Sequence, residues 1–346
     1  MKPEKATSDR KKDHIDICLN ENVKYSVSNG FQKYVFEHNA ITEVNFEQIS
    51  VKSEFFGKSI DYPFIISCMT GGTAEAKSIN LGLLEIANAL NIPIGVGSQR
   101  QALENTDFHD SYKVFKKSAQ NIPVLSNLGA AQTARLTNRD LIVKLIDQVG
   151  ASAFVVHCNP LQELLQKEGE PDFSGLLKSI DKITSNIDIP VIVKEVGSGI
   201  SKSAAKKLLD VGVKGIDVAG AGGTSWGAVE LIRNGNKEEQ YFRNWGLPTS
   251  YCIKNVNELK KNYNFLLIAS GGITNFDDIS KSLALGADLT ASANIILKKI
   301  NSSGVEGAIQ FVQTEFNEVK KIMYLTGCKT ISELKDAKLL LKEDLY

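Results

Sequence analysis

From about residue 62 onward, short apolar segments alternate with longer amphipathic ones. The apolar segments are rich in β-branched residues and predict strands at 63–69, 92–96, 123–127, 153–157, 191–195, 215–219, 265–270 and 288–293. The segments between them have helical spacing; the first shows one apolar stripe, made of Ile79, Leu83, Ile86, Ala87 and Leu90. Continuous apolar strands joined by helical crossovers indicate a parallel sheet that is buried on both faces.

Three of the helical segments end in a glycine just before a strand, at Gly150, Gly212 and Gly286. Glycine readily adopts the left-handed conformation that closes the C-terminus of a helix. About eight such strand–helix units favour a closed (β/α)8 TIM barrel of the α/β class over an open, doubly wound sheet.

Two regions fall outside this repeat. Residues 1–61 precede the first strand and are predicted to form an N-terminal cap or arm that contributes to the substrate site, whereas residues 62–346 form the barrel domain. Residues 221–263, after the sixth strand, are too long for a simple loop and predict an insertion or lid. The apolar spacing over 305–323 predicts the closing barrel helix, followed by a short terminal helix.

Composition narrows the class of protein. Lysine plus arginine and aspartate plus glutamate both total 40, which argues against a nucleic-acid binder. The five cysteines are scattered without a CxxC spacing, so neither a disulfide framework nor a zinc site is indicated. The charged N-terminus is not a signal peptide, and no apolar run approaches the roughly 20 residues of a membrane span. We therefore expect a soluble cytoplasmic protein.

Polar and glycine-rich clusters follow most of the predicted strands. Since functional groups of a (β/α)8 barrel gather at the C-terminal ends of its strands, these clusters predict a site there. They are Cys68–Gly72, Gly97–Arg100, Ser126–Ala130, His157–Glu163, Lys194–Glu195, Gly220–Ser225 and Ser270–Gly272.

Two of these clusters carry a more specific chemistry. The segment 270–274, followed by a helix from Asn275, offers backbone N–H groups at a helix N-terminus, as a phosphate site requires. The alternative is a tight, well-capped turn. Lys194 ends a buried strand, so its ammonium either points into the barrel mouth or pairs with Glu195. Adjacent strand residues face opposite sides, which disfavours the pair.

A set of motifs in consistent order resembles the type 2 isopentenyl-diphosphate isomerases from about residue 8 to about residue 330. The motifs are RKKDH at 10–14, MTGG at 69–72, GVGSQR at 95–100, SNLGA at 126–130, HCNPLQE at 157–163, VKEVGSGIS at 193–201, DVAGAGGTSW at 217–226, WGLPT at 245–249 and ASGGI at 269–273. The first and fifth are specific to that family, whereas the GGT and SGGI pieces occur in other FMN-binding barrels.

The resemblance implies conversion of isopentenyl diphosphate into dimethylallyl diphosphate, by adding one proton and removing another, in isoprenoid biosynthesis. It also implies reduced FMN, NADPH as the reductant of the flavin, and Mg²⁺ to bind the diphosphate. A homotetramer is expected by analogy.

The same resemblance implies roles for individual residues. FMN would be bound by Met69, Thr70, Gly71, Ser98, Asn127, Lys194, Thr224, Gly271 and Gly272. The substrate would be bound by Arg10, Lys11, Ser98, Gln99, Arg100, His157, Asn159 and Gln162. Gln162, Lys194 and His157 would act in catalysis, and Glu163 would bind Mg²⁺.

From the residues alone, other interpretations stay open. Arg10 and Lys11 could belong to a solvated charge run, His157 could be a buried structural histidine, and Glu163 could stabilise a helix N-terminus.

Other protein classes also remain. A 2-hydroxy-acid oxidase should carry a catalytic histidine late in the barrel, but no histidine follows His157. A nucleotide dehydrogenase needs a cysteine after the sixth strand, and residues 220–227 contain none. A non-catalytic phosphate-binding barrel is the third alternative.

Overall fold

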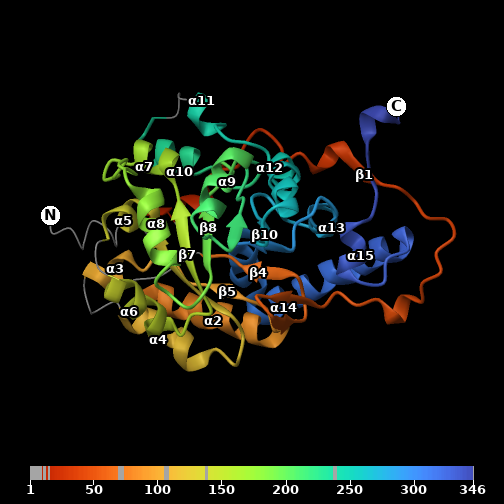
Figure 1. Ribbon diagram of the computed structural model, residues 1–346, viewed down its shortest axis with the longest axis horizontal. Coiled ribbons are helices and arrows are strands. Elements are labelled where there is room, and N and C mark those ends of the chain that lie inside the picture. The colour runs from red at the N-terminus through yellow and green to blue at the C-terminus, as the bar shows by residue number, and fades with distance from the viewer. Residues whose placement is uncertain are drawn as a thin grey trace.

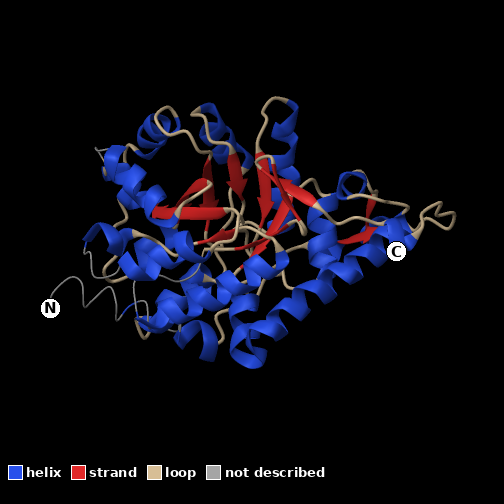
Figure 2. Cartoon of the chain, turned by 90° about the horizontal axis from the view of Figure 1, so that it is seen from below, coloured by secondary structure: helices blue, strands red, loops and turns tan. Residues whose placement is uncertain are grey.

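Eight parallel strands form a closed barrel in the computed structural model, in the order β10-β11-β4-β5-β6-β7-β8-β9, with helices around it (Figures 1 and 2). The structure describes residues 10, 13–14, 16–68, 74–104, 109–136, 139–236 and 240–345. The barrel strands are β4 (Phe64–Ile66), β5 (Ile94–Gly95), β6 (Val124–Gly129), β7 (Ala153–Cys158), β8 (Val191–Glu195), β9 (Gly215–Asp217), β10 (Leu266–Ala269) and β11 (Leu289–Ser292). Each overlaps a strand predicted from the sequence, so the (β/α)8 prediction is confirmed.

Helices follow the strands and cover the outside of the barrel. They are α2 (Ala74–Leu90), α3 (Arg100–Glu104), α4 (His109–Ser118), α5 (Ala130–Arg135), α6 (Arg139–Val149), α7 (Pro160–Leu165), α8 (Leu176–Thr184), α9 (Lys202–Asp210), α12 (Thr249–Asn257), α13 (Phe276–Ala284) and α14 (Asn294–Thr326). The apolar stripe predicted on α2 is buried against the strands, with Leu83, Ile86, Ala87 and Leu90 each at most 2% exposed. None of the described helices is both long and apolar enough to cross a membrane.

The predicted N-terminal cap divides between the two ends of the barrel. Arg10, His14, Cys18 and residues 21–24 contribute side chains to the cavity at the mouth. Further along, β2 (Ser53–Phe55) and β3 (Lys58–Ile60) form a hairpin whose Phe55 and Ile60 pack among inward-facing residues of the barrel strands and close the opposite end. Between these parts, β1 (Tyr34–Phe36) pairs antiparallel with β12 (Leu339–Leu341), which joins the two ends of the chain.

The insertion predicted over 221–263 contains two added helices, α10 (Trp226–Arg233) and α11 (Gln240–Arg243). Helix α10 packs against α7 at the mouth. The last part of the predicted insertion, α12, packs against α9 and β10 and is therefore the ordinary barrel helix of its unit. The added segment is thus shorter than the sequence predicted.

The closing helix begins earlier than the predicted residue 305. Helix α14 starts at Asn294 and changes direction at Gly304, whose φ of 70° and ψ of −174° are not helical. The part after this glycine buries Val312, Phe316 and Val319, as predicted. The part before it places its N-terminus at the barrel mouth. The short terminal helix is α15 (Ile331–Lys335).

Strand register brings one glycine and three polar residues to the same level at the mouth. Gly129 on β6 is the pairing partner of His157 on β7, which pairs with Lys194 on β8, which pairs with Asp217 on β9. Residues far apart in the sequence therefore meet at the C-terminal ends of the strands.

Candidate active site

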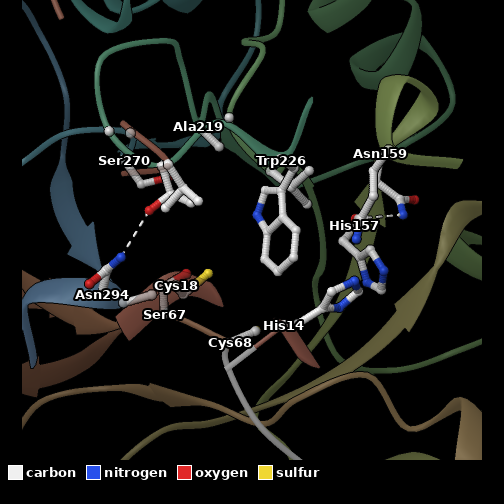
Figure 3. A pocket seen from close by; sticks show the side chains of 18 of the residues that line it. His14, Cys18, Ser67, Cys68, His157, Asn159, Ala219, Trp226, Ser270 and Asn294 are labelled. Atoms are coloured by element: carbon white, nitrogen blue, oxygen red, sulfur yellow. Dashed lines mark hydrogen bonds between the residues drawn. The ribbon is translucent and has the colours of Figure 1, made fainter. Parts of the chain in front are cut away.

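A cavity of about 480 Å³ opens at the C-terminal end of the barrel. Each of the eight barrel strands contributes a residue at or just after its C-terminal end: Ser67, Ser98, Asn127, His157, Lys194, Ala219, Ser270 and Ser292. In Figure 3, the indole of Trp226 lies between a group that includes Ser270 and Asn294 and a group that includes His157, Asn159 and His14. The cavity therefore has two sides, which are described in turn.

The first side is built from two glycine-rich loops in backbone contact. Gly271 has a φ of 98°, and a Cβ there would lie 2.1 Å from the carbonyl oxygen of Gly220, so only glycine fits. Thr224 from the other loop accepts a hydrogen bond from Asn294 Nδ2 (3.0 Å). Gly271, Gly272, Thr224 and Asn294 all line the cavity, as predicted for the first three. Asn294 was not predicted, because the segment after the eighth strand has no sharp phosphate motif.

Two helix N-termini lie at this side: that of α13, which the sequence predicted as a phosphate site, and that of α14. At α13, Asn275 accepts a hydrogen bond from the amide of Asp278 (3.0 Å), and Asp278 accepts one from the amide of Thr274 (3.2 Å), so these donors are already used. At α14, in contrast, the N-cap residue Ala293 makes no side-chain hydrogen bond.

Ala293, Asn294 and Ile295 line the cavity, and the amides of residues 294–296 have no acceptor within the described part of the chain. The N-terminus of α14 is therefore the better anion site. The glycine loops, the Thr224 hydroxyl and these amides fit a phosphate such as that of FMN.

Lys194 lies on the floor of the cavity, as predicted, and is only 8% exposed. Its Nζ donates to the backbone oxygen of Glu195 (2.6 Å). The Glu195 carboxylate faces the other way and accepts from the amides of Val196 and Gly197 (both 2.7 Å), so the alternative of a Lys194–Glu195 side-chain pair is wrong. Burial raises the pKa of Glu195, and these backbone hydrogen bonds oppose the shift.

Asp217 lies behind Lys194 and is 4% exposed. It accepts a hydrogen bond from Ser270 Oγ (2.5 Å). Burial raises the pKa of Asp217, whereas the positive charge of Lys194 lowers it. Lys194 thus sits beside a buried acid, which is its pairing partner on β9.

Asn127 connects the floor to the second side of the cavity. Its Oδ1 lies 2.9 Å from Nδ1 of His157, so it fixes the orientation of the imidazole. Both residues line the cavity, together with Ser98. His157 therefore faces the cavity with one ring nitrogen bonded to Asn127.

Gln99 is the exception among the predicted substrate ligands, because it does not line the cavity. Its side chain is completely buried. The amide nitrogen donates to the carbonyl of Leu145 (3.0 Å), and the amide oxygen accepts from Ser126 Oγ (2.5 Å) and from the amide of Asn127 (3.1 Å). Gln99 therefore supports Asn127 from behind, and we do not retain it as a substrate ligand.

The second side of the cavity gathers cationic groups. Arg10 and Arg100 both line it. Burial lowers the pKa of Arg10, and the charge of Arg100 lowers it further, whereas the nearby carboxylates of Glu163, Glu230 and Glu168 oppose the shift. When the side-chain amide of Gln166 is flipped, which also lets its nitrogen donate to Glu230, Arg10 Nη1 donates to its oxygen (2.9 Å). Arg100 Nη2 lies 3.0 Å from Glu170 Oε1. Two like charges that converge on one partly buried space favour an anion between them.

Glu163, Asn159 and Gln162 from α7 complete this side. Glu163 is 8% exposed and accepts hydrogen bonds from Asn159 Nδ2 (2.9 Å) and from the amide of Glu170 (2.7 Å). Among the described residues, no group of three or more acidic, histidine or cysteine side chains could hold a metal ion. Glu163 fits Mg²⁺ only as a single carboxylate that acts together with phosphate oxygens and water.

A buried acid that was not predicted, Glu230 on α10, contacts two residues that line the cavity. Its Oε1 lies 2.8 Å from Nε2 of His14 and accepts a hydrogen bond from Nε2 of Gln162 (3.1 Å). The His14 ring packs edge-on against Trp226, with centroids 5.2 Å apart. His14 and Trp226 stand in two of the family motifs, so sequence could have found them, whereas Glu230 lies in no motif. Of the predicted site residues, Lys11, Met69, Thr70 and Gly71 lie outside the described residues.

Comparison with known proteins agrees with this geometry. Residues 137–341 match the model of the FMN-dependent dehydrogenase family. Crystal structures of mandelate oxidase have the same fold: one superposes with a TM-score of 0.65 over 98% of this chain and 99% of the oxidase, at 13% sequence identity. Another gives the same score over 97% of this chain and 98% of the oxidase, at 15% identity.

Sequence relatives are much more similar and span nearly the whole chain. The isopentenyl-diphosphate delta-isomerase of Chlorobaculum parvum is 42% identical over 96% of this chain and 96% of the relative. That of Pelodictyon phaeoclathratiforme is 41% identical over 97% and 98%. That of Pyrococcus furiosus is 40% identical over 94% and 84%. The chain therefore belongs to the FMN-dependent, type 2 family of isopentenyl-diphosphate delta-isomerases.

Proposed function

We propose that this protein isomerises isopentenyl diphosphate to dimethylallyl diphosphate in isoprenoid biosynthesis, with reduced FMN as its cofactor. The observation that carries the proposal is the two-sided cavity. One side offers glycine loops and a free helix N-terminus to a phosphate, and the other offers Arg10 and Arg100 to a second anion. An enzyme that holds a flavin phosphate and a substrate diphosphate at once needs both.

FMN would be held by residues from both glycine loops and from α14. Thr224, Gly271, Gly272 and Asn294 would hold its phosphate, and Lys194 would bind its ring system. When bound and reduced, the flavin supplies acid–base chemistry without net oxidation of the substrate. The positive charge of Lys194 would stabilise an anionic ring in this water-poor site. NADPH is the reductant that the family implies.

The diphosphate would lie between Arg10 and Arg100. An anion there would replace the repulsion between two guanidinium groups by attraction to both. Ser98, His157 and Asn159 line the same space and offer further polar groups. Lys11, which follows Arg10 in the sequence, remains a predicted ligand.

Glu163 would bind Mg²⁺ together with the diphosphate oxygens. Its carboxylate is already oriented by Asn159 Nδ2 and by the amide of Glu170. Pre-oriented ligands reduce the cost of binding a cation that keeps much of its water shell.

The isoprenoid chain would lie beside Gln162 and Trp226, between the two phosphate sites. Gln162 Nε2 donates to Glu230, which also contacts His14, so the amide is held in one orientation. An amide is a poor base, and we therefore assign Gln162 the task of positioning the reacting carbon rather than removing a proton from it. The homotetramer and the cytoplasmic location remain predictions.

The test is turnover by purified protein. FMN reconstitution followed by anaerobic reduction should give conversion of isopentenyl diphosphate into dimethylallyl diphosphate, observed by NMR, and conversion should need Mg²⁺. Protein without FMN, and protein left oxidised, are the controls. A fully reduced holoprotein that does not convert the substrate in the presence of Mg²⁺ would refute the proposal.

A further inference from the structure

Residues 22–31 cross the barrel mouth and connect the two glycine-rich loops; we call this segment the mouth strap. Its first half pairs with the loop after β9. Lys24 forms an antiparallel bridge with Thr224, the amide of Tyr25 donates to Gly223 O (3.0 Å), and the amide of Ser225 donates to Val23 O (2.8 Å). The strap thus fixes one of the loops that line the phosphate side.

Asn29 connects the strap to the other loop. Its Nδ2 donates to Gly272 O (2.9 Å) and to Asp278 Oδ1 (3.2 Å), while its Oδ1 accepts from the amide of Phe31 (3.2 Å). The fit to the first loop is also close, because a Cβ on Gly222 would lie 2.5 Å from the Asn29 Cα. One residue therefore touches both loops, with its backbone against Gly222 and its side chain bonded to Gly272 O, although it does not itself line the cavity.

The bond from Asn29 to Gly272 O has a directional consequence. In a trans peptide the C=O and the following N–H point in opposite directions. When Asn29 holds the Gly272 carbonyl, the N–H of Ile273 is directed away from the strap. Ile273 lines the cavity, and its N–H has no acceptor within the described part of the chain.

Asp278 strengthens this arrangement. Its Oδ2 takes the next amide along, that of Thr274 (3.2 Å), and its Oδ1 is held by Asn29. The carboxylate is thus kept on the outer side of the loop, because each of its two oxygens already accepts a hydrogen bond. A phosphate that approaches Ile273 meets an amide donor and not this acid.

We propose that Asn29 is a positioning residue for the phosphate of bound FMN. It holds the Gly272–Ile273 peptide so that its N–H faces the phosphate, and it keeps the Asp278 carboxylate away. The inference rests on FMN binding and does not depend on the isomerase reaction.

The test compares FMN with riboflavin, which has the same ring and no phosphate. Affinities are measured by quenching of flavin fluorescence on full-length apoprotein. Asn29→Ala should raise the dissociation constant for FMN about tenfold, as expected for the loss of one well-placed hydrogen bond and a misdirected amide. Riboflavin affinity should change less than about twofold, because Asn29 does not line the cavity and, among the described residues that do, its side chain bonds only to Gly272, in the loop assigned to the phosphate.

Two further variants sharpen the comparison. Asn29→Ser keeps an oxygen for the amide of Phe31 but is too short to reach Gly272 O. It should therefore lose FMN affinity as Asn29→Ala does, and it replaces Asn29→Ala in the test if that variant does not fold. Ser26→Ala is the matched control, since it removes a strap bond to Asn244 Oδ1 (2.7 Å) and none to the glycine loops. It should leave both affinities unchanged.

Unchanged FMN affinity in Asn29→Ser and Asn29→Ala would overturn the proposal. An equal loss for FMN and riboflavin would also overturn it, because the strap would then support the whole cavity and not the phosphate. Wild-type apoprotein without affinity for FMN would contradict the cofactor assignment instead, so the two failures are distinguishable.

Discussion

The substitution Arg10→Ala tests whether the cationic side of the cavity binds diphosphate. Arg10 reaches the mouth from the N-terminal segment, lines the cavity and lies close enough to Arg100 for its pKa to be lowered by that charge, after the larger effect of burial. A solvent-exposed arginine far from other charges would have its pKa lowered neither by burial nor by a neighbouring cation. The substitution removes one of the two guanidinium groups and no part of the FMN side.

The expected magnitude follows from two opposing contributions. A charge-assisted hydrogen bond to phosphate contributes about 1.5–3 kcal/mol, which corresponds to about a tenfold to a hundredfold loss of affinity. Removal of Arg10 also relieves its repulsion with Arg100 in the free protein, which offsets part of that loss. We therefore expect the KM for isopentenyl diphosphate to rise about tenfold, at the lower end of this range.

The assay measures KM, kcat and bound FMN in the same preparation, with FMN quantified by its absorbance after denaturation. FMN content should be unchanged, since Arg10 lies on the other side of the cavity. Lys202→Ala is the matched control, because it removes a surface cation whose partner is Glu258 and should change none of the three values. Wild-type KM in Arg10→Ala, with full FMN content, would refute the reasoning.

Four further predictions concern other parts of the molecule. Glu163→Gln should raise the Mg²⁺ concentration needed for half-maximal activity, and an unchanged Mg²⁺ titration would remove Glu163 from the metal site. Lys194→Met should lower the midpoint potential of bound FMN by roughly tens of millivolts, since about 30 mV corresponds to 1.4 kcal/mol in a two-electron couple; spectroelectrochemistry that shows no shift would contradict this role. Burial raises the pKa of the Cys68 thiol to about 12. Since only the thiolate reacts, alkylation of Cys68 by iodoacetamide should be very slow at pH 8 and should quicken roughly tenfold per pH unit. Rapid labelling at pH 8, measured by mass spectrometry, would contradict the raised pKa. The hydrogen bond from Arg233 lowers the pKa of Glu168 to about 2, so this carboxylate stabilises the fold above its ordinary pKa of about 4.5 and ceases to do so as the pH falls toward 2. The difference in free energy of unfolding between wild type and Glu168→Gln should therefore shrink over that interval. A difference that stays constant would show that the pair contributes nothing.

The sequence by itself determined the barrel and the end at which the cavity lies. Apolar segments with helical crossovers specify buried parallel strands, and parallel strands bring all their C-terminal ends to one face. The clusters that contain His157, Lys194 and Gly271 therefore had to meet, however far apart they are in the chain. The family motifs indicated the chemistry, because a pattern of apolar and polar residues shows which side chains are buried but not what they bind.

Tertiary structure decided which of those residues face the cavity. Gln99 and Arg100 are neighbours in one motif, yet Gln99 is bonded to Leu145 and Ser126 behind the wall, whereas Arg100 lines the site. At the phosphate side, likewise, the first turn of α13 is capped by Asn275, which accepts a hydrogen bond from the amide of Asp278, whereas the N-cap residue of α14 makes no side-chain hydrogen bond.

Sequence patterns could not predict the contact of Glu230 with His14 or that of Asn29 with Gly272 either. A local pattern of apolar and polar residues encodes burial and helical or strand period. It does not encode which distant donor meets which acceptor, because that depends on how the segments pack, and in this protein the packing at the mouth determines the site.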